Sequence, residues 1–235
     1  MPHPNVLILG IGNLLWADEG FGVRAVEVLN QHYQLPDNVQ LMDGGTQGIY
    51  LVPYVQEADV LIVFDAIDYG LPPGTLKIIR DADVPKFMGA KKMSLHQTGF
   101  QEVLAMAELL GDYPEQLMLI GVQPVELEDY GGSLRAETKA QIRPALNIAI
   151  KFLQGLGIEL TTRLEPLGDH QKLSPHSLDI NHYEMQRPSP TEACRTGDER
   201  ILQSPGIRFD PKSEDLESLN LSVNVDQRAG QQRKT

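Results

Sequence analysis

The sequence predicts an α/β fold, a three-layer sandwich in which helices cover both faces of a twisted, mostly parallel sheet of about five strands. Short and almost entirely apolar runs recur along the chain, as buried parallel strands require. Amphipathic helical patterns separate these runs, and such alternation is typical of a sheet covered on both faces. The chain has 235 residues, 41% of them hydrophobic, which is enough for one sizeable core.

The elements of the first half follow from periodicity and from turn residues. Val23, Val26 and Leu29 recur at helical spacing, which predicts an amphipathic helix. Clusters of Pro, Gly, Asp and Asn separate the apolar runs. In chain order we expect a strand at 5–9, helices at 21–32 and 49–55, and strands at 39–42, 58–64 and 75–79.

The second half continues the alternation. Residues 81–93 have no clear period, and good helix formers with one apolar face follow at 100–110. A buried strand is expected at 117–122. A long helix is expected from about 134 to 156, and Pro144 should kink or interrupt it.

A composition shift near Arg163 predicts two regions. Aliphatic residues become sparse beyond it, and six of the 16 prolines lie there. Such a segment buries too little apolar surface to offset its ordering entropy. We therefore expect an α/β domain at 1–163 and a low-complexity, disordered tail at 164–235.

Charge and composition exclude several classes of partner. A formal net charge of −12 disfavours a nucleic-acid backbone, which binds clusters of Lys and Arg. Cys194 is the single cysteine, which excludes an intrachain disulfide and a multi-cysteine metal site. No run reaches the ~20 apolar residues of a membrane span, and the chain opens without a signal-peptide pattern. We expect a cytoplasmic protein with no membrane span.

A glycine-rich loop follows the first expected strand. Gly10 and Gly12 match the start of a dinucleotide fingerprint, but Leu15 occupies the position of its third glycine. Asp18 and Glu19 add negative charge, which repels phosphate and attracts cations. The loop therefore favours a cation site, and a nucleotide-binding module is the weaker hypothesis.

Three polar residues, Glu19, Asp65 and His96, lie at or near the carboxyl ends of expected strands. A parallel sheet brings such positions to one edge. Two carboxylates and one imidazole suit a divalent first-row ion and leave coordination positions open. Structural alternatives stay open: Asp18 and Glu19 can complement a helix dipole, Asp65 can cap the next segment, and His96 can be an ordinary loop histidine.

Two further residues have open roles, and some chemistries are excluded. Asp43 in Asp-Gly-Gly-Thr can serve the turn, and it stands too far after Gly12 for the ribose-binding position of a dinucleotide fingerprint. Trp16 can contact substrate or lie partly buried at the edge. Neither a Gly-x-Ser-x-Gly elbow nor a His-Glu-x-x-His motif occurs, which disfavours a serine hydrolase and a zincin. Cys194 lies in the predicted tail without a base, which excludes it as a nucleophile.

Taken together, the motifs resemble the hydrogenase maturation protease family. The motifs are Gly-Ile-Gly-Asn-Leu-Leu at 10–15, Asp-Glu-Gly-Phe-Gly-Val-Arg at 18–24, Asp-Gly-Gly-Thr at 43–46, Asp-Ala at 65–66, Ser-Leu-His-Gln at 94–97 and Leu-Ile-Gly-Val-Gln-Pro at 119–124. The resemblance implies an aspartic-type endopeptidase that removes the C-terminal peptide from the nickel-loaded precursor of the nickel–iron hydrogenase large subunit. It also implies that Glu19, Asp65 and His96 bind the nickel, which arrives with the substrate, and that Asp43 lies beside them.

Two mechanisms and one alternative function stay open at this point. The ion can polarise a carbonyl or acidify a bound water. Nickel can instead be only a recognition handle, with Asp43 or Asp65 as the catalytic carboxylate that activates water. The alternative function is a non-catalytic nickel-binding chaperone that binds the same precursor and leaves it uncut.

Overall fold

The computed structural model describes residues 3–88, 95–165, 167–168 and 171–187, with the side chains of 86–88 and 95–98 left out. The chain up to Arg187 forms one compact unit. Residues 188–235, and with them Cys194 and most of the predicted tail, lie outside the described residues. None of the described helices is long and apolar enough to cross a membrane.

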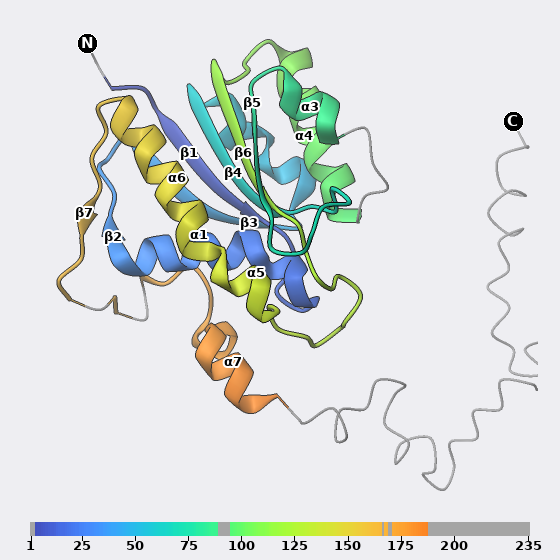
Figure 1. The fold of residues 1–235 in the computed structure, drawn as a ribbon. Helices are drawn as coiled ribbons and strands as arrows, with labels where there is room; N and C mark the ends of the chain where they lie inside the picture. Colours follow the sequence, from blue (N-terminus) through green and yellow to red (C-terminus); the bar gives the residue numbers. More distant parts are fainter. Residues whose placement is uncertain (1–2, 89–94, 166, 169–170, 188–235) are drawn as a thin grey trace, which may run out of the picture. The chain divides into compact units, whose positions relative to one another are not determined.

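A five-stranded sheet forms the centre of this unit, in the order β3-β1-β4-β6-β5 (Figure 1). The strands β1 (Val6–Ile11), β3 (Val39–Gly45), β4 (Val60–Ala66) and β6 (Gln116–Val122) run parallel. The edge strand β5 (Leu76–Arg80) pairs antiparallel with β6. The predicted sheet of about five mostly parallel strands is confirmed.

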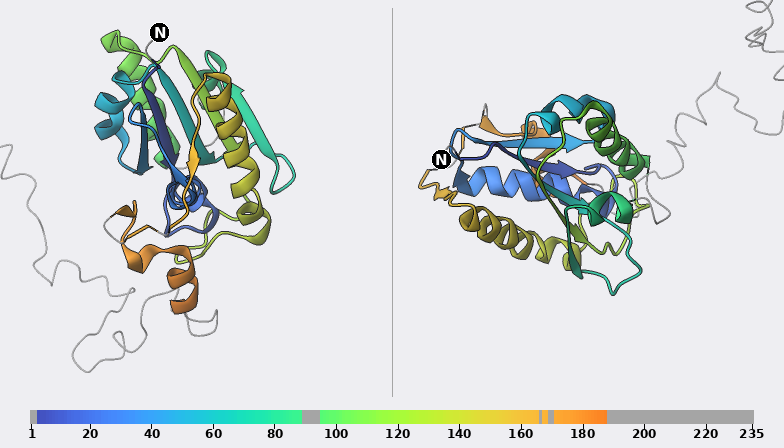
Figure 2. Two further views of the ribbon diagram at one scale, coloured as in Figure 1. Left: turned by 90° about the vertical axis from the view of Figure 1, so that its left-hand side faces the viewer. Right: turned by 90° about the horizontal axis from the view of Figure 1, so that it is seen from above.

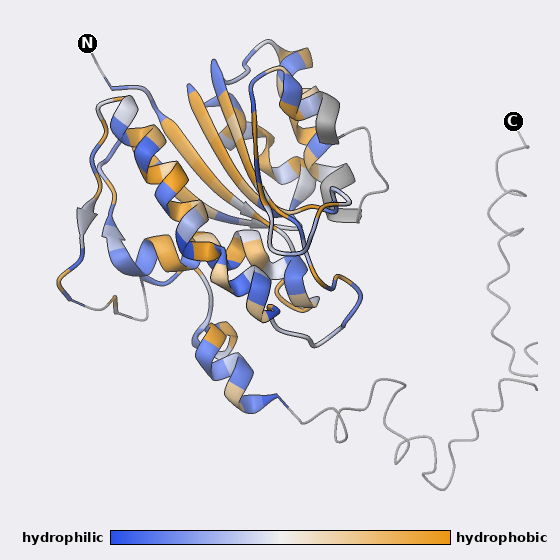
Figure 3. Ribbon diagram, in the orientation of Figure 1, coloured by the Kyte–Doolittle hydropathy of each residue, from blue (hydrophilic) through white to orange (hydrophobic). Residues whose placement is uncertain are grey.

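Helices cover both faces of the sheet, as the two further views show (Figure 2). On one face α1 (Phe21–His32) and α6 (Ile142–Gly155) share a core cluster with β1, β4 and β6. On the other face lie α2 (Val52–Gln56), α3 (Asp83–Met88) and α4 (Leu95–Leu110). The central strands β1, β4 and β6 are accordingly hydrophobic along most of their length (Figure 3), and the predicted three-layer sandwich is confirmed.

Two helical segments differ from the sequence prediction. The helix expected at 134–156 is divided into α5 (Ala136–Ala140) and α6, and Pro144 lies in the first turn of α6. Proline is tolerated there because the first N–H groups of a helix have no intrahelical acceptor. The segment without clear period contains α3, a short helix whose Val84 is fully buried.

The chain around and beyond residue 163 continues to pack on the domain. The short strands β2 (Tyr33–Gln34) and β7 (Thr161–Thr162) pair antiparallel. The 3-10 helix η4 (His176–Leu178) and α7 (Ile180–Gln186) follow. The compact unit therefore extends beyond the boundary predicted at residue 163. Leu173 and Ile180 of this segment pack against the core, and polar contacts also hold it.

Candidate active site

The carboxyl ends of β1, β3 and β4 form the edge where the sequence places the site. Gly10 on β1 pairs with Asp43 on β3 and with Phe64 on β4, so these positions form one row across the sheet. The chain leaves β1 towards β3 and later crosses to β4 on the other side of β1. Ligands of open α/β sheets bind outside such a switch point.

Glycines let α1 begin directly against this edge. A Cβ added at Gly10 would lie 2.3 Å from the carbonyl oxygen of Gly22, and one at Gly22 would lie 2.2 Å from the carbonyl oxygens of Ile11 and Phe64. Gly12 has a φ of 135°. The Gly-x-Gly pattern thus has a structural explanation in helix packing, with Gly22 rather than position 15 at the closest approach.

Asp18 and Glu19, adjacent in the 3-10 helix η1 (Ala17–Gly20), have different surroundings. Asp18 is fully buried. Its Oδ2 accepts hydrogen bonds from the backbone N–H groups of Val125 (2.8 Å) and Glu126 (3.0 Å). Its Oδ1 accepts a hydrogen bond from the backbone N–H of Arg135 (2.7 Å). Asp18 therefore anchors the loop after β6, a role that the sequence analysis missed.

Glu19 and Asp65 both bring a carboxylate to the edge. Glu19 is partly buried in η1, which contacts β4, and its Oε2 is shielded from solvent. Asp65 is 3% exposed near the end of β4. Its Oδ1 accepts a hydrogen bond from the N–H of Ala66 (2.8 Å), and its Oδ2 is also shielded from solvent. Two of the three predicted metal ligands thus follow neighbouring strands at the same edge.

Tyr69 is a neighbour of Asp65 that the sequence analysis missed. Burial, and then the negative charge of Asp65, raise the pKa of the Tyr69 hydroxyl well above its usual range, so the phenol stays neutral. Gly121, which pairs with Asp65, makes room for it, because a Cβ there would lie 1.9 Å from the Tyr69 hydroxyl. A neutral phenol can donate a hydrogen bond but cannot neutralise a carboxylate.

Gln123 holds the loop after β4 in place. Its Oε1 accepts hydrogen bonds from the N–H groups of Tyr69 (2.7 Å) and Leu71 (3.1 Å). Its Nε2 donates to Asp68 Oδ1 (3.0 Å), which also accepts from the N–H of Gly70 (2.9 Å). Asp68 therefore has a turn role, and the Gln-Pro motif after β6 stabilises the loop that carries Tyr69.

Asp43 lies near the end of β3 on the side of α1. Burial and the negative charge of Glu27 raise the pKa of its carboxyl to about 6, while a hydrogen bond from the Gly45 backbone and the charge of Arg24 lower it. Glu27 and Arg24 both belong to α1 and were missed from the sequence. A carboxylate with a pKa near neutrality can act as a general base.

The two aspartates approach the edge from opposite faces of the sheet. Asp43 lies in the row of Phe64, whose side chain packs in the core on the α1 side. Asp65 is the next residue of β4, and successive side chains of a strand point to opposite faces. Tyr69, its neighbour, packs in the core on the α4 side. The site therefore differs from a pair of aspartates that share one proton.

His96 lies in the first turn of α4, and only its backbone is described. The start of α4 lies beside η2 (Gly48–Leu51), the segment after β3, where a Cβ at Gly99 would be 3.6 Å from the Cα of Gly48. Among the side chains that the structure describes, no three His, Cys, Asp or Glu converge as a metal site. The metal set of Glu19, Asp65 and His96 stays a prediction, because its third side chain is not described.

Apolar side chains are exposed in the loops that surround this edge. Trp16 is partly buried and packs edge-on against Tyr130, with ring centroids 5.2 Å apart. The loops after β1, β3, β4 and β6 all contribute, which gives the edge an apolar rim that we name the loop rim. Its exposed members are Leu15, Ile49, Tyr50, Leu71, Val125 and Tyr130.

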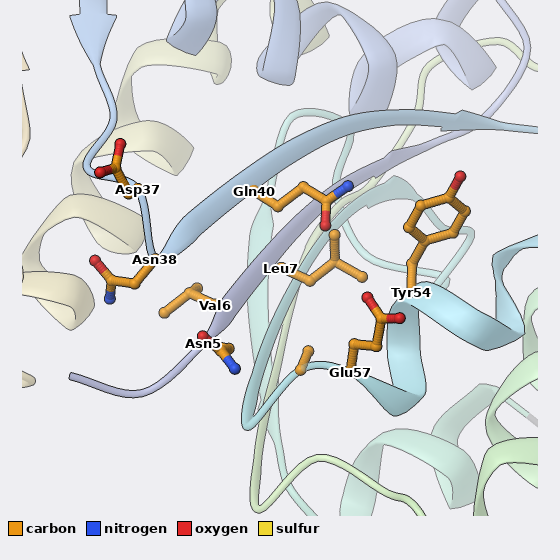
Figure 4. Close-up of a pocket in the computed structure, with 9 residues that line it drawn as sticks. Asn5, Val6, Leu7, Asp37, Asn38, Gln40, Tyr54 and Glu57 are labelled. Carbon is orange, nitrogen blue, oxygen red and sulfur yellow. The ribbon is translucent and has the colours of Figure 1, made fainter. Parts of the chain in front are cut away.

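A separate cavity lies at the opposite edge of the sheet, near the amino ends of β1 and β3 (Figure 4). Its volume is about 220 Å³, and its polar lining includes Asn5, Asp37, Asn38 and Glu57. None of the predicted site residues lines it. The candidate active site therefore lies outside this cavity, at the carboxyl edge of the sheet.

The fold and the acidic edge define a class of α/β endopeptidase that is known from solved structures. The hydrogenase maturating endopeptidase HybD of Escherichia coli matches with a TM-score of 0.64 and 41% identity, covering 68% of this chain and 98% of that one. The family model described as hydrogenase maturation protease matches residues 23–152. The chain belongs to the hydrogenase maturation protease family, and it is accordingly a hydrolase of the endopeptidase class.

Curated relatives agree with this assignment. The hydrogenase expression/formation protein HupM of Azotobacter chroococcum is 63% identical over 207 residues, which is 88% of this chain and 98% of HupM. The hydrogenase 2 maturation protease of Escherichia coli is 42% identical over 159 residues, which is 67% of this chain and 96% of that protein. The sequence-based resemblance to this family is confirmed.

Proposed function

We propose that the protein removes the C-terminal peptide from the precursor of the nickel–iron hydrogenase large subunit, and that it cleaves only precursor that already holds nickel. The observation that carries this proposal is the pair of shielded carboxylates, Glu19 and Asp65, at the switch point of a maturation-protease fold. In this proposal nickel is bound with or through the substrate precursor.

Glu19, Asp65 and His96 are the proposed contacts of the nickel ion. Two carboxylates and an imidazole suit a divalent first-row ion. The shielded oxygens of Glu19 and Asp65 support this set, since carboxylate oxygens held at the carboxyl edge of the sheet are suitable ligands for a dication. When present, the ion supplies a Lewis acid that can polarise the scissile carbonyl.

Asp43 is the proposed general base, with Asp65 as the second candidate. The pKa of Asp43 near 6 leaves it largely ionised at neutral pH and still able to take a proton. In this scheme water adds its oxygen to the scissile carbonyl carbon while Asp43 accepts its proton. The peptide C–N bond then breaks, and the proton passes to the leaving amine. This would make the enzyme aspartic-type in the broad sense that a carboxylate activates water.

The loop rim is the proposed contact surface for the precursor. A protein substrate must seat its C-terminal segment across the carboxyl edge, and exposed aromatic side chains are strong contributors to such contacts. Ile49 and Tyr50 are 57% and 77% exposed beside the start of α4. Replacing both with Ser should raise the KM for precursor with little effect on kcat.

The decisive experiment mixes the protein with purified nickel-loaded precursor and looks for a short C-terminal peptide by mass spectrometry. Nickel-free precursor should stay intact. The Glu19→Gln, Asp65→Asn and His96→Ala variants should lose cleavage, and His32→Ala, which replaces a histidine at the distant end of α1, is the matched control. Precursor that binds tightly and is never cut would instead favour the nickel-binding chaperone. Cytoplasmic localisation stays a prediction.

A further inference from the structure

The segment beyond the predicted domain boundary is tied to α1 and to the loop before α5. We name residues 171–184 the C-terminal strap. Asn30 Nδ2 donates a hydrogen bond to the carbonyl oxygen of Gln171 (2.8 Å). Ser133 Oγ donates to Glu184 Oε1 (2.8 Å), and Lys139 forms an ion pair with the same carboxylate (2.9 Å). The strap therefore crosses the outside of α1 with polar anchors at both ends.

Between these anchors the strap completes the surroundings of Arg24. This arginine is 3% exposed, and its Nη1 lies 2.8 Å from Glu27 Oε2. The same Nη1 donates to the carbonyl oxygen of Leu178, and the guanidinium carbon lies 5.9 Å from the ring centroid of Tyr183. A buried ion pair is tolerated when additional hydrogen bonds satisfy its charged groups. The strap supplies both the carbonyl and the ring.

The Arg24–Glu27 pair also acts on Asp43. Glu27 disfavours the ionised Asp43 carboxylate and Arg24 favours it. Among the residues that the structure describes, these are the charged side chains that act on Asp43, and both come from α1. On the strap side, burial raises the pKa of the Tyr183 hydroxyl, and the charge of Arg24 partly offsets this rise. Burial also acts to raise the pKa of Glu184, but its hydrogen bonds with Lys139 and Ser133, together with the charge of Arg24, lower it below its usual range. One guanidinium thus links the strap to a carboxyl at the edge of the sheet.

We propose that the C-terminal strap holds the Arg24–Glu27 pair in place against Asp43, which makes Arg24 a positioning residue for that carboxyl. The family match ends at residue 152, before the strap. The match to HupM spans 88% of this chain. A match of that length includes the strap whichever residue of this chain the match starts at. The strap is thus shared with a relative of similar length and lies outside the matched family core. Only the role of Asp43 in cleavage depends on the proposed function.

The test follows the ionisation of Asp43 in the full-length protein without any substrate. The ¹³C resonance of the Asp43 side-chain carboxyl is assigned by its absence in Asp43→Asn and is titrated with pH. In the parent protein the midpoint should lie at about 6. Arg24→Gln should raise it and Glu27→Gln should lower it, each on the order of one pH unit. Arg24→Lys, which keeps the charge, should lie closer to the parent than Arg24→Gln does.

The strap itself is tested by Tyr183→Ala, with Met185→Ala as the matched control on the same helix, where Met185 is 78% exposed. Tyr183→Ala should move the Asp43 midpoint towards the Arg24→Gln value, and Met185→Ala should leave it unchanged. If the strap only stabilises the fold, Tyr183→Ala would lower the melting temperature and leave the Asp43 midpoint at the parent value. That result would overturn the proposal.

The pH dependence of precursor cleavage is the second readout. It should shift with the Asp43 midpoint in each variant. A midpoint that moves while the cleavage profile stays constant would support the strap and refute Asp43 as the base. The failure of the proposed chemistry can therefore be distinguished from failure of this inference.

Discussion

Asp18 and Glu19 are neighbours in the sequence, and the structure predicts opposite consequences for their removal. The fully buried Asp18 carboxylate accepts three backbone hydrogen bonds from the chain after β6. Hydrogen bonds to charged groups contribute about 1.5–3 kcal/mol each, and their losses are not additive. Because the donors are only partly buried, water can replace part of the loss. We expect Asp18→Ala to lower the free energy of unfolding by about 2–4 kcal/mol.

Urea unfolding followed by circular dichroism measures this loss, and it corresponds to a fall in melting temperature of about 5–15 °C for a domain of this size. Glu19→Ala is the matched control, because the same 3-10 helix carries it and it is only partly buried. That variant should unfold within about 1 kcal/mol of the parent and should lose cleavage of nickel-loaded precursor. An Asp18→Ala protein as stable as the parent would refute the anchoring role, and equal destabilisation by both variants would refute the division between them.

Substitutions at Asp43, Tyr69 and two glycines have distinct expected outcomes. Asp43→Asn should abolish cleavage, and the parent rate should fall as the pH drops through about 6, since a base must be deprotonated. The folded pKa of Asp43 lies above its ordinary value, so ionising this carboxyl destabilises the folded protein as the pH rises from 3.8 to about 6. Asp43→Asn should therefore melt at a higher temperature than the parent at pH 7. Tyr69→Phe should lower kcat with little change in melting temperature, because it removes only the hydroxyl beside Asp65. Gly22→Ala should prevent stable folding, because its Cβ would lie 2.2 Å from two backbone carbonyl oxygens. A Cβ at Gly155 would have no atom within 4 Å, so Gly155→Ala should stabilise the helix by about 0.5–1 kcal/mol. Thermal melts followed by circular dichroism test both variants.

The fold was predictable because it rests on local pattern. The apolar runs of β1, β4 and β6 are buried along almost their whole length, and α1 covers the predicted residues. Strand ends also predicted where Asp43 and Asp65 lie along the chain, near the carboxyl ends of β3 and β4. What pattern cannot supply is a contact between distant segments. Asp18 is held by groups more than 100 positions away, and nothing in Asp-Glu distinguishes the anchor from the site residue.

The extent of the domain was missed for a related reason. Hydrophobic periodicity is a signal of burial, and the strap has little of it. Two of its apolar side chains, Leu173 and Ile180, pack partly buried against the core. It is also held by polar contacts from Arg24, Asn30, Ser133 and Lys139, which donate to its carbonyls and to Glu184. Two of these donors, Arg24 and Asn30, lie on α1. Apolar spacing predicts this helix but does not predict which partners its polar side chains bind. A segment with little hydrophobic periodicity can therefore be held on a domain by contacts that composition does not reveal.

The anchors around the edge bear on how a nickel-loaded precursor would be recognised. Asp18 holds the loop after β6 and Gln123 holds the loop after β4, and these loops carry Val125 and Leu71 of the loop rim. Rigid loops lose little entropy on binding, so the rim can bind precursor whether or not it holds nickel. Under the proposed function, discrimination would then come from contacts to the ion, because a difference in affinity between loaded and empty precursor requires an interaction that only the loaded form makes. Loss of Glu19 or Asp65 should therefore abolish the preference for loaded precursor in a binding assay, while loss of the rim should weaken both forms alike.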